Sequence, residues 1–291
     1  MSIRVYINGQ IVGPEAATVS VLDRGFLFGD SVYETLASFD GRLVFLAEHL
    51  DRLQRSAQHI YLILPARALI EAAIRQTVAA TGETAVRVRV MVTRGAGTID
   101  LDPRTASRPS LIVIAQPLGA PSDEMLEKGV AVALAKASRA SATGVSPKVK
   151  SGNYLGSVLA IAEVRQKFPT ANEALMCSAN GSLAEGATSN VFLVEEGVIS
   201  TPAVDVGILD GVTRGKVLAL ARAQGLQTRE EPFLAPERLH SADEVFLTSA
   251  VRGILPVTSV DGQPVGDANP GPITRRLWNL YQQLMNEAEW T

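Results

Sequence analysis

Cysteine, histidine and aromatic residues are all scarce in this chain of 291 residues. The single cysteine, Cys177, cannot form a disulfide within the chain, and its place in the apolar run 174–177 predicts a buried strand residue. The three histidines, at positions 49, 59 and 240, are not spaced as metal ligands. We therefore expect neither a disulfide framework nor a structural metal site.

The chain also has little excess charge and no long hydrophobic run. Its net charge of −3 lacks the positive excess that is typical of proteins that bind nucleic acid or an anionic membrane. No apolar run approaches the length needed to span a bilayer, and residues 1–6 lack the apolar core of a secretory signal. We expect a soluble cytoplasmic protein whose partner is a small molecule.

What the chain does have is enough apolar sequence for a sizeable core, with 46% hydrophobic and 20% charged residues. Predicted strands and helices mix without the regular spacing of a parallel sheet, which favours the α+β class. Residues 117–122 contain two prolines and a glycine, which is typical of a linker between domains. We therefore predict a first domain at 1–117, a linker at 118–122 and a second domain at 123–291.

Periodicity predicts several elements of the first domain. Residues 32–39 alternate as a strand, and Asp40-Gly41 predicts that a hairpin follows. Residues 86–92 alternate strictly, which places Arg87, Arg89 and Met91 on one face of a strand. Residues 46–60 have the spacing of an amphipathic helix. The strand predicted at residues 5–10 is expected to pair with residues 17–22 after a turn.

A lysine set among small residues, Lys150 in the segment 147–155, stands directly before an apolar pattern at helical spacing. Taken alone, such a lysine indicates a solvated surface residue. Three further segments change that interpretation, and they lie at residues 48–53, 185–192 and 211–214.

In this order and at these separations, the four segments resemble the fold-type IV pyridoxal-phosphate enzymes, also called class IV aminotransferases. This family includes branched-chain and D-amino-acid aminotransferases, R-selective amine transaminases and aminodeoxychorismate lyases. The resemblance implies two domains: a small N-terminal α/β domain and a larger C-terminal domain with a barrel-like sheet. It also implies pyridoxal 5'-phosphate as cofactor, a homodimer and a role in amino-acid metabolism.

By this resemblance, Lys150 is the catalytic residue. It forms the Schiff base with the cofactor and moves a proton between the substrate Cα and the cofactor, which requires a neutral amine after release. Lys148 is the competing candidate. The branched-chain branch of the family places its lysine four residues before the asparagine, at Val149 here, whereas other branches place it three before, at Lys150.

Glu185 lies in a predicted glycine-flanked turn at residues 183–186, directly before a predicted strand. The resemblance implies that this carboxylate binds the pyridine nitrogen of the cofactor. Its negative charge keeps the ring protonated, and a protonated ring is the better electron sink. The alternative interpretation is a solvated glutamate in a turn.

Phosphate binding is expected at two segments and one arginine. Val212 and Thr213 precede a predicted helix, whose free N–H groups and positive end attract anions. Arg52 would complete this clamp with a charge-assisted hydrogen bond. Ser249 and Ala250 match a second phosphate loop. Ala250 stands where family transaminases have a threonine, so Ser249 or backbone N–H groups must serve.

Substrate contacts are expected from Tyr33, which matches an aromatic residue on the substrate side of the cofactor. Tyr154 matches a tyrosine that hydrogen-bonds the cofactor ring in part of the family. The Arg-x-His pair of D-amino-acid transaminases is absent after residues 93–95. Arg87 or Arg89 can replace it, although two exposed arginines on an edge strand are an equal alternative.

Three functions remain open on the sequence. The leading hypothesis is an aminotransferase that moves an amino group from an amino acid or primary amine to a 2-keto acid. The runner-up is 4-amino-4-deoxychorismate lyase, which keeps the cofactor and eliminates pyruvate, and which the pair Ser249-Ala250 favours. The third is a pyridoxal-phosphate carrier without catalysis.

Overall fold

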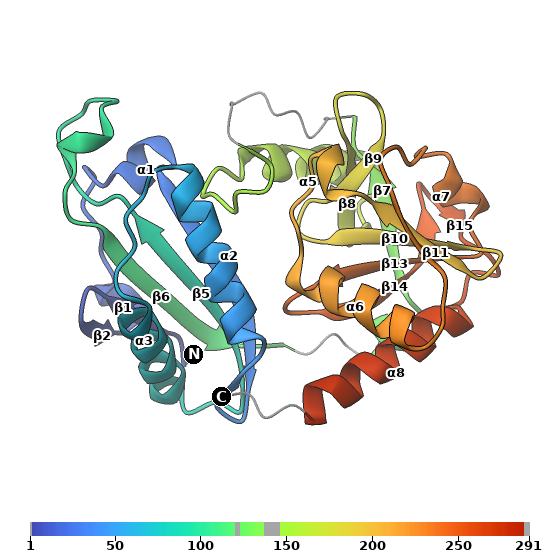
Figure 1. Cartoon of the computed structure of the whole chain (residues 1–291), viewed down its shortest axis with the longest axis horizontal. Coiled ribbons are helices and arrows are strands. Elements are labelled where there is room, and N and C mark those ends of the chain that lie inside the picture. The colour runs from blue at the N-terminus through green and yellow to red at the C-terminus, as the bar shows by residue number, and fades with distance from the viewer. Residues whose placement is uncertain (1, 120–122, 137–145, 288–291) are drawn as a thin grey trace. The chain divides into compact units, whose positions relative to one another are not determined.

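The computed structural model describes residues 2–119, 123–136 and 146–287. These residues form two compact units, each with its own sheet (Figure 1). The first unit holds residues 2–119 and 149–153, and the second holds 123–136, 146–148 and 154–287. Helices and strands mix in both, as the α+β prediction requires. Part of the predicted linker, 120–122, lies outside the described residues, and the boundary stays a prediction.

The first unit is built on a six-stranded antiparallel sheet in the order β2-β1-β6-β5-β3-β4. Its strands are β1 (Arg4–Ile7), β2 (Gln10–Val12), β3 (Ser31–Phe39), β4 (Arg42–Leu43), β5 (Ala85–Thr93) and β6 (Ser110–Pro117). The β3 and β5 strands pair along their whole length, from Ser31 opposite Thr93 to Phe39 opposite Ala85. This long ladder makes β3 and β5 the central support of the unit.

Three α-helices of the described residues belong to the first unit: α1 (Arg24–Phe28), α2 (Leu46–His59) and α3 (Arg67–Thr81). α2 packs on β3, and α3 packs on β1, β5 and β6 (Figure 1). The buried side chains of α2 include Leu46, Leu50, Leu53 and Ala57. They recur at helical spacing, so the amphipathic pattern is confirmed and the sheet is what the apolar face covers.

One predicted strand of the first unit is wrong. Residues 17–22 form no strand, and β1 pairs instead with β2, with Ile7 opposite Gln10. The turn between them is Asn8-Gly9, and both residues have positive φ, 47° and 103°. Such a two-residue turn matches the twist of a hairpin and returns the chain at once. The hairpin predicted at Asp40-Gly41 is confirmed by the pairing of β3 with β4.

The second unit contains a nine-stranded mixed sheet in the order β12-β11-β10-β13-β14-β7-β8-β9, with β15 beside β14. The pairs β11/β12, β14/β7 and β7/β8 are parallel. The strands are β7 (Val130–Leu134), β8 (Glu173–Cys177), β9 (Leu183–Gly186), β10 (Asn190–Glu195), β11 (Val198–Pro202), β12 (Thr228–Glu231), β13 (Glu244–Ser249), β14 (Gly253–Val260) and β15 (Gln263–Pro264).

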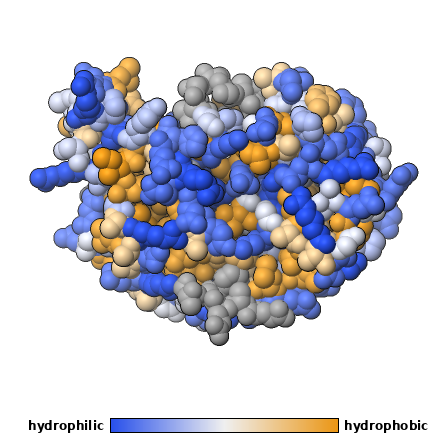
Figure 2. Space-filling view, in the orientation of Figure 1, coloured by the Kyte–Doolittle hydropathy of each residue, from blue (hydrophilic) through white to orange (hydrophobic). Residues whose placement is uncertain are grey.

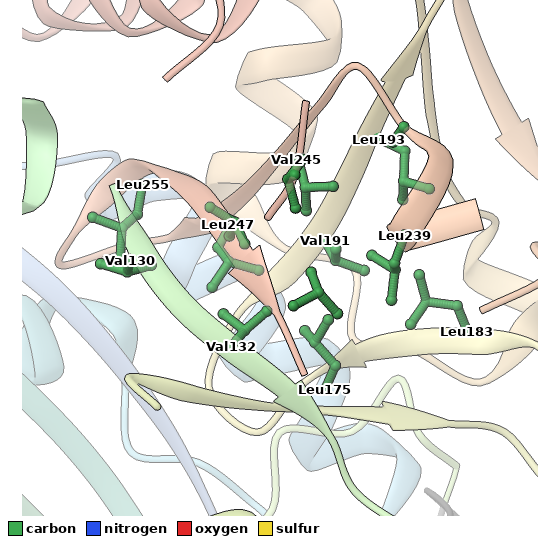
Figure 3. Packing of buried hydrophobic residues seen from close by; sticks show 14 of the residues in the cluster. Val130, Val132, Leu175, Leu183, Val191, Leu193, Leu239, Val245, Leu247 and Leu255 are labelled. Carbon is green, nitrogen blue, oxygen red and sulfur yellow. The ribbon is translucent and has the colours of Figure 1, made fainter. Parts of the chain in front are cut away.

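The core of the second unit gathers branched aliphatic side chains from several strands (Figure 3). Leu175 of β8, Val191 of β10 and Leu247 of β13 belong to this cluster, and each is almost completely buried. β-Branched and leucine side chains suit this position because they pack closely on a pleated surface. Cys177 ends β8 half-buried, and burial raises the pKa of its thiol.

The helices of the second unit are α4 (Asp123–Glu127), α5 (Leu155–Lys167), α6 (Val212–Ala223), α7 (Arg238–Ser241) and α8 (Pro272–Glu287). α5 packs on β8, α6 and α8 pack on each other and on β13, and α8 also packs on β14. Hydrophilic residues cover much of the face shown in Figure 2, with smaller hydrophobic areas between them. Among the described helices, none combines the length and the apolarity needed to cross a membrane.

Candidate functional site

Lys150 is joined to β3 of the first unit through its own backbone. The Lys150 carbonyl accepts a hydrogen bond of 3.0 Å from the Tyr33 N–H, and Ser151 forms a β-bridge with Val32. The Gly152 N–H donates to the Ser31 carbonyl at 3.1 Å. A short extended segment from the second half of the sequence is thereby fixed along a strand from the first half.

The Lys150 amine lies over the Tyr33 ring, with Nζ 4.5 Å from the ring centroid. Tyr33 is only 3% exposed, and the Arg89 guanidinium lies 3.9 Å from the same centroid. Lys148 differs: it is exposed, and its Nζ is 3.1 Å from Asp205 Oδ1. Of the two competing lysines, Lys150 is therefore the one held against a buried aromatic ring.

Arg52 lies in a buried ion pair. Its Nε donates to Glu34 Oε1 and its Nη2 to Glu34 Oε2, each at 2.8 Å, and His49 Nδ1 lies 2.8 Å from Oε2. Burial raises the pKa of the Glu34 carboxyl, but the charge and hydrogen bonds of Arg52, with those of His49, outweigh it and lower the pKa to about 2. The carboxylate stays ionised, and a phosphate contact for Arg52 stays a prediction.

Arg87 and Arg89 do share one face of β5, but their surroundings differ. Arg87 is exposed, whereas Arg89 is half-buried and lies over Tyr33. The alternative of two arginines on an edge strand is wrong, because β5 lies between β3 and β6 inside the sheet. The structure brings Arg89, Tyr33 and Lys150 together and leaves Arg87 outside this group.

In the second unit, Glu185 lies on the short strand β9 and is buried. The alternative of a solvated glutamate in a turn is therefore wrong. Glu185 Oε2 accepts hydrogen bonds from Asn190 Nδ2 at 3.2 Å and from the Leu209 N–H at 3.1 Å. The prediction missed this strand because it has only four residues and ends at a glycine.

Asn190 connects the cofactor segments predicted in the second unit. Its Nδ2 donates both to Glu185 and to the Leu209 carbonyl, and on β10 it lies opposite Thr248 of β13. A Cβ added at Gly211 would come within 2.0 Å of Asn190 Oδ1, so a larger residue there would displace the Asn190 side chain. Asn190 thus joins Glu185, the approach to α6 and the end of β13.

Val212 and Thr213 form the first turn of α6, with Gly211 as N-cap. Among the described residues, no side chain caps this helix start, and the buried Thr213 hydroxyl lies beside the Tyr281 hydroxyl. Free N–H groups at a helix N-terminus favour an anion. A phosphate group would accept hydrogen bonds from these N–H groups, and the Thr213 hydroxyl lies in the same turn.

Ser249 ends β13 and Ala250 begins the turn that follows. The Ser249 hydroxyl accepts from the backbone N–H and from Nε of Arg252, each at 3.4 Å. Arg252 Nη2 in turn donates to Glu173 Oε2 at 2.7 Å. This ion pair fixes the turn to β8.

Tyr154 is the N-cap residue of α5 and is half-buried. Its place at a cofactor ring stays a prediction. The sequence reasoning assigned no role to Glu34, Glu173 or Asn190. Only Asn190 had a signal, because it lies inside the motif 185–192 that contains Glu185.

The donor set suits pyridoxal 5'-phosphate better than a metal ion. Within the described residues, no cluster of His, Cys, Asp and Glu side chains could hold a metal. The first unit instead offers a half-buried amine, and the second offers a buried carboxylate and a helix start without a side-chain cap. These match the aldehyde, the pyridine nitrogen and the phosphate of this cofactor.

Comparison with known proteins agrees with this chemistry. A family model described as "Amino-transferase class IV" matches residues 31–260. The chain is 35% identical over 286 residues to a D-alanine aminotransferase of Staphylococcus epidermidis, covering 97% of this chain and 98% of that protein.

Two solved structures are similar over nearly the whole chain. One is the branched-chain amino acid aminotransferase of Escherichia coli, with a TM-score of 0.91 and 30% identity, covering 99% of this chain and 97% of that one. The other is the T.th. branched-chain amino acid aminotransferase with pyridoxamine 5'-phosphate, with a TM-score of 0.88 and 30% identity, covering 96% and 93%.

These similarities confirm the two expectations drawn from the motifs, the fold of the fold-type IV enzymes and transaminase activity. The lyase alternative is not favoured, because the relatives are named aminotransferases. A carrier without catalysis is likewise not favoured. The family is pyridoxal-phosphate-dependent. The chain belongs to the class IV aminotransferase family and is a transaminase.

Proposed function

We propose that Lys150 of this transaminase carries pyridoxal 5'-phosphate and that the amino donor is an amino acid. The observation that supports this most directly is the setting of Lys150. Its backbone is hydrogen-bonded to β3 and its amine lies over the buried Tyr33 ring, whereas Lys148 is exposed and paired with Asp205. An amine that must reach the same carbon atom in every turnover needs a backbone that is held in place in this way.

When bound, pyridoxal phosphate withdraws electrons from the substrate Cα, so that the Cα proton becomes acidic enough to remove. The residues of this chain would hold the cofactor, orient the substrate and transfer that proton. Lys150 Nζ would hold the cofactor covalently through its aldehyde group. The same nitrogen, once free, would take the proton from the substrate Cα and pass it on as a general acid.

Glu185 is the proposed partner of the pyridine nitrogen. Its carboxylate is buried and its orientation is fixed by donors from Asn190 and Leu209. A fixed negative charge there would hold the ring nitrogen protonated. The N–H groups of Val212 and Thr213, with the Thr213 hydroxyl, would bind the phosphate, and Ser249, the backbone at Ala250 and Arg52 would add further donors.

Substrate recognition is proposed for Tyr33 and Arg89. The Arg89 guanidinium and the Lys150 amine contact the same ring, so a carboxylate bound by Arg89 would bring its Cα near the amine. Arg87 is exposed and is the weaker candidate. Since relatives are named branched-chain and D-alanine aminotransferases, we propose a small or branched aliphatic donor. A 2-keto acid is the acceptor.

We further propose a cytoplasmic homodimer. In the first unit Phe26, Ile99 and Leu101 are 68%, 73% and 78% exposed, and apolar side chains of this size favour burial against a partner. Size-exclusion chromatography with light scattering measures the mass of the protein in solution. A monomer at micromolar concentration would contradict the proposal.

The test of the cofactor role compares Lys150→Ala with Lys148→Ala. Purified wild type should absorb in the visible range, and borohydride reduction should leave the cofactor mass on the peptide that contains residue 150. Lys150→Ala should lose this mass and at least about 10³-fold in activity, the scale expected when a covalent catalyst is removed. Lys148→Ala should retain both. A cofactor mass on Lys148 would overturn the assignment.

A screen of D- and L-amino acids then identifies the donor. Each is added alone to the loaded enzyme, and loss of the resting absorbance reports the half-reaction. Pyruvate release from aminodeoxychorismate without a keto-acid acceptor would contradict transamination.

A further inference from the structure

Ser56 lies on α2, one turn beyond Arg52, and is 1% exposed. Its hydroxyl oxygen accepts a hydrogen bond of 3.1 Å from the Lys150 backbone N–H. Nothing in the motif that contains Arg52 points to this contact, because it joins residues 94 positions apart. A buried side chain is thus bonded to the backbone of the residue proposed to carry the cofactor.

Together, Ser56 and Tyr33 hold both polar backbone groups of Lys150. The N–H donates to Ser56 on α2, and the carbonyl accepts from the Tyr33 N–H on β3. A lysine side chain is flexible along its whole stem, so its reach is defined only as well as its Cα is fixed. Hydrogen bonds from two different elements fix both the position of the Lys150 Cα and the direction in which its side chain leaves the backbone.

The two elements that hold Lys150 are themselves joined in the core of the first unit. Glu34 of β3 binds Arg52 and His49 of α2 through three contacts of 2.8 Å. Leu53, on α2 beside them, is fully buried. The Ser56 hydroxyl therefore has little freedom to move relative to the Tyr33 N–H.

We propose that Ser56 is a positioning residue for catalysis: its hydroxyl sets the direction from which the Lys150 amine reaches the substrate Cα. The proposal rests on the proposed function of Lys150. Ser56 itself touches neither substrate nor cofactor in this role. Its removal leaves the partly buried Lys150 N–H without this acceptor, and the segment 149–153 then shifts to find another.

The experiment compares Ser56→Ala with Ser38→Ala. Ser38 is a matched control because it is a fully buried serine of the same unit, on β3, and its hydroxyl has no hydrogen-bond partner among the described residues. Ser56→Ala should slow the half-reaction at saturating amino donor about tenfold, the scale of a small misplacement of a catalytic group. KM should change less than about twofold. Ser38→Ala should match wild type in both.

Two readouts separate positioning from a general loss of structure. Borohydride reduction should still leave the cofactor mass at residue 150 in Ser56→Ala, because attachment needs only that the amine reach the cofactor. The pH midpoint of the resting absorbance should move in Ser56→Ala but not in Ser38→Ala, since the amine then sits differently against Tyr33.

Ser56→Cys keeps the shape of the side chain but supplies only a weak acceptor, so it reports the same loss if the alanine variant fails to fold. An unchanged half-reaction rate in either folded variant would overturn the proposal, as would a loss equal to that of Ser38→Ala. Absence of cofactor at residue 150 in wild type would instead refute the proposed function.

Discussion

The two units hold their buried carboxylates in different ways. In the first, Glu34 is bound by the Arg52 guanidinium and by His49, so its charge is neutralised inside the protein. In the second, two donors that orient Glu185 are the neutral N–H groups of Asn190 and Leu209. Neutral donors fix the direction of a carboxylate without themselves cancelling its charge. Glu34 therefore stabilises the fold, whereas Glu185 is the carboxylate that we propose as the partner of the pyridine nitrogen.

The largest effect on stability is expected from Glu34→Gln. The change leaves the Arg52 guanidinium buried without its counter-charge, and breaking a buried pair in this way costs about 3–5 kcal/mol. Urea denaturation measures the loss in the free energy of unfolding. Glu71→Gln is the control, because the exposed pair of Arg67 with Glu71 contributes about 0–1 kcal/mol. Equal losses in both variants would contradict the assignment of Glu34 to the fold.

Of the two buried carboxylates, Glu185 is the one whose replacement by Gln is expected to have the larger effect on activity. The amide oxygen can still accept from Asn190 and Leu209, so the free energy of unfolding should change by less than about 1 kcal/mol. The fixed negative charge is lost, and kcat should fall about 10²- to 10³-fold. Steady-state kinetics with excess cofactor checks this. An activity near wild type would show that Glu185 does not act on the cofactor ring.

A smaller effect should appear in acid, and it concerns Glu34 again. Its pKa is lowered from an ordinary value near 4.5 to about 2 in the folded protein. A lowered folded pKa means that the stabilisation is fully present above the unfolded pKa and is lost as the pH falls from about 4.5 toward about 2. Denaturation midpoints between pH 6 and 3 should fall less steeply in Glu34→Gln than in wild type. Parallel curves would contradict this.

Much of the first unit could be predicted from local pattern. The alternation at residues 32–39 and 86–92 and the helical spacing at 46–60 correspond to β3, β5 and α2. Such periods are local properties, because one face of each element must be apolar. What alternation could not reveal is that β3 is buried on both faces. The buried carboxylate of Glu34 therefore had no sequence signal.

For the candidate site, too, short motifs identified the residues, whereas contacts between distant residues could not be predicted. Lys150, Glu185 and Thr213 were found because each lies in a short motif whose residues are neighbours in sequence. The contacts that orient them were not found: Ser56 on Lys150, and Leu209 on Glu185, join residues far apart in the chain. The strand at Glu185 was also missed, since four residues carry too little periodicity.

By itself, the sequence determined the α+β class, the family motifs and the chemical types of the site residues, since all three are written in composition, period and short spacing. Only the tertiary structure decided that Lys150 rather than Lys148 is held against a buried ring, that Arg52 is paired with Glu34, and that Ser56 reaches the lysine backbone. Burial and hydrogen-bond pairing depend on which distant segments pack together, and packing is a property of the whole fold.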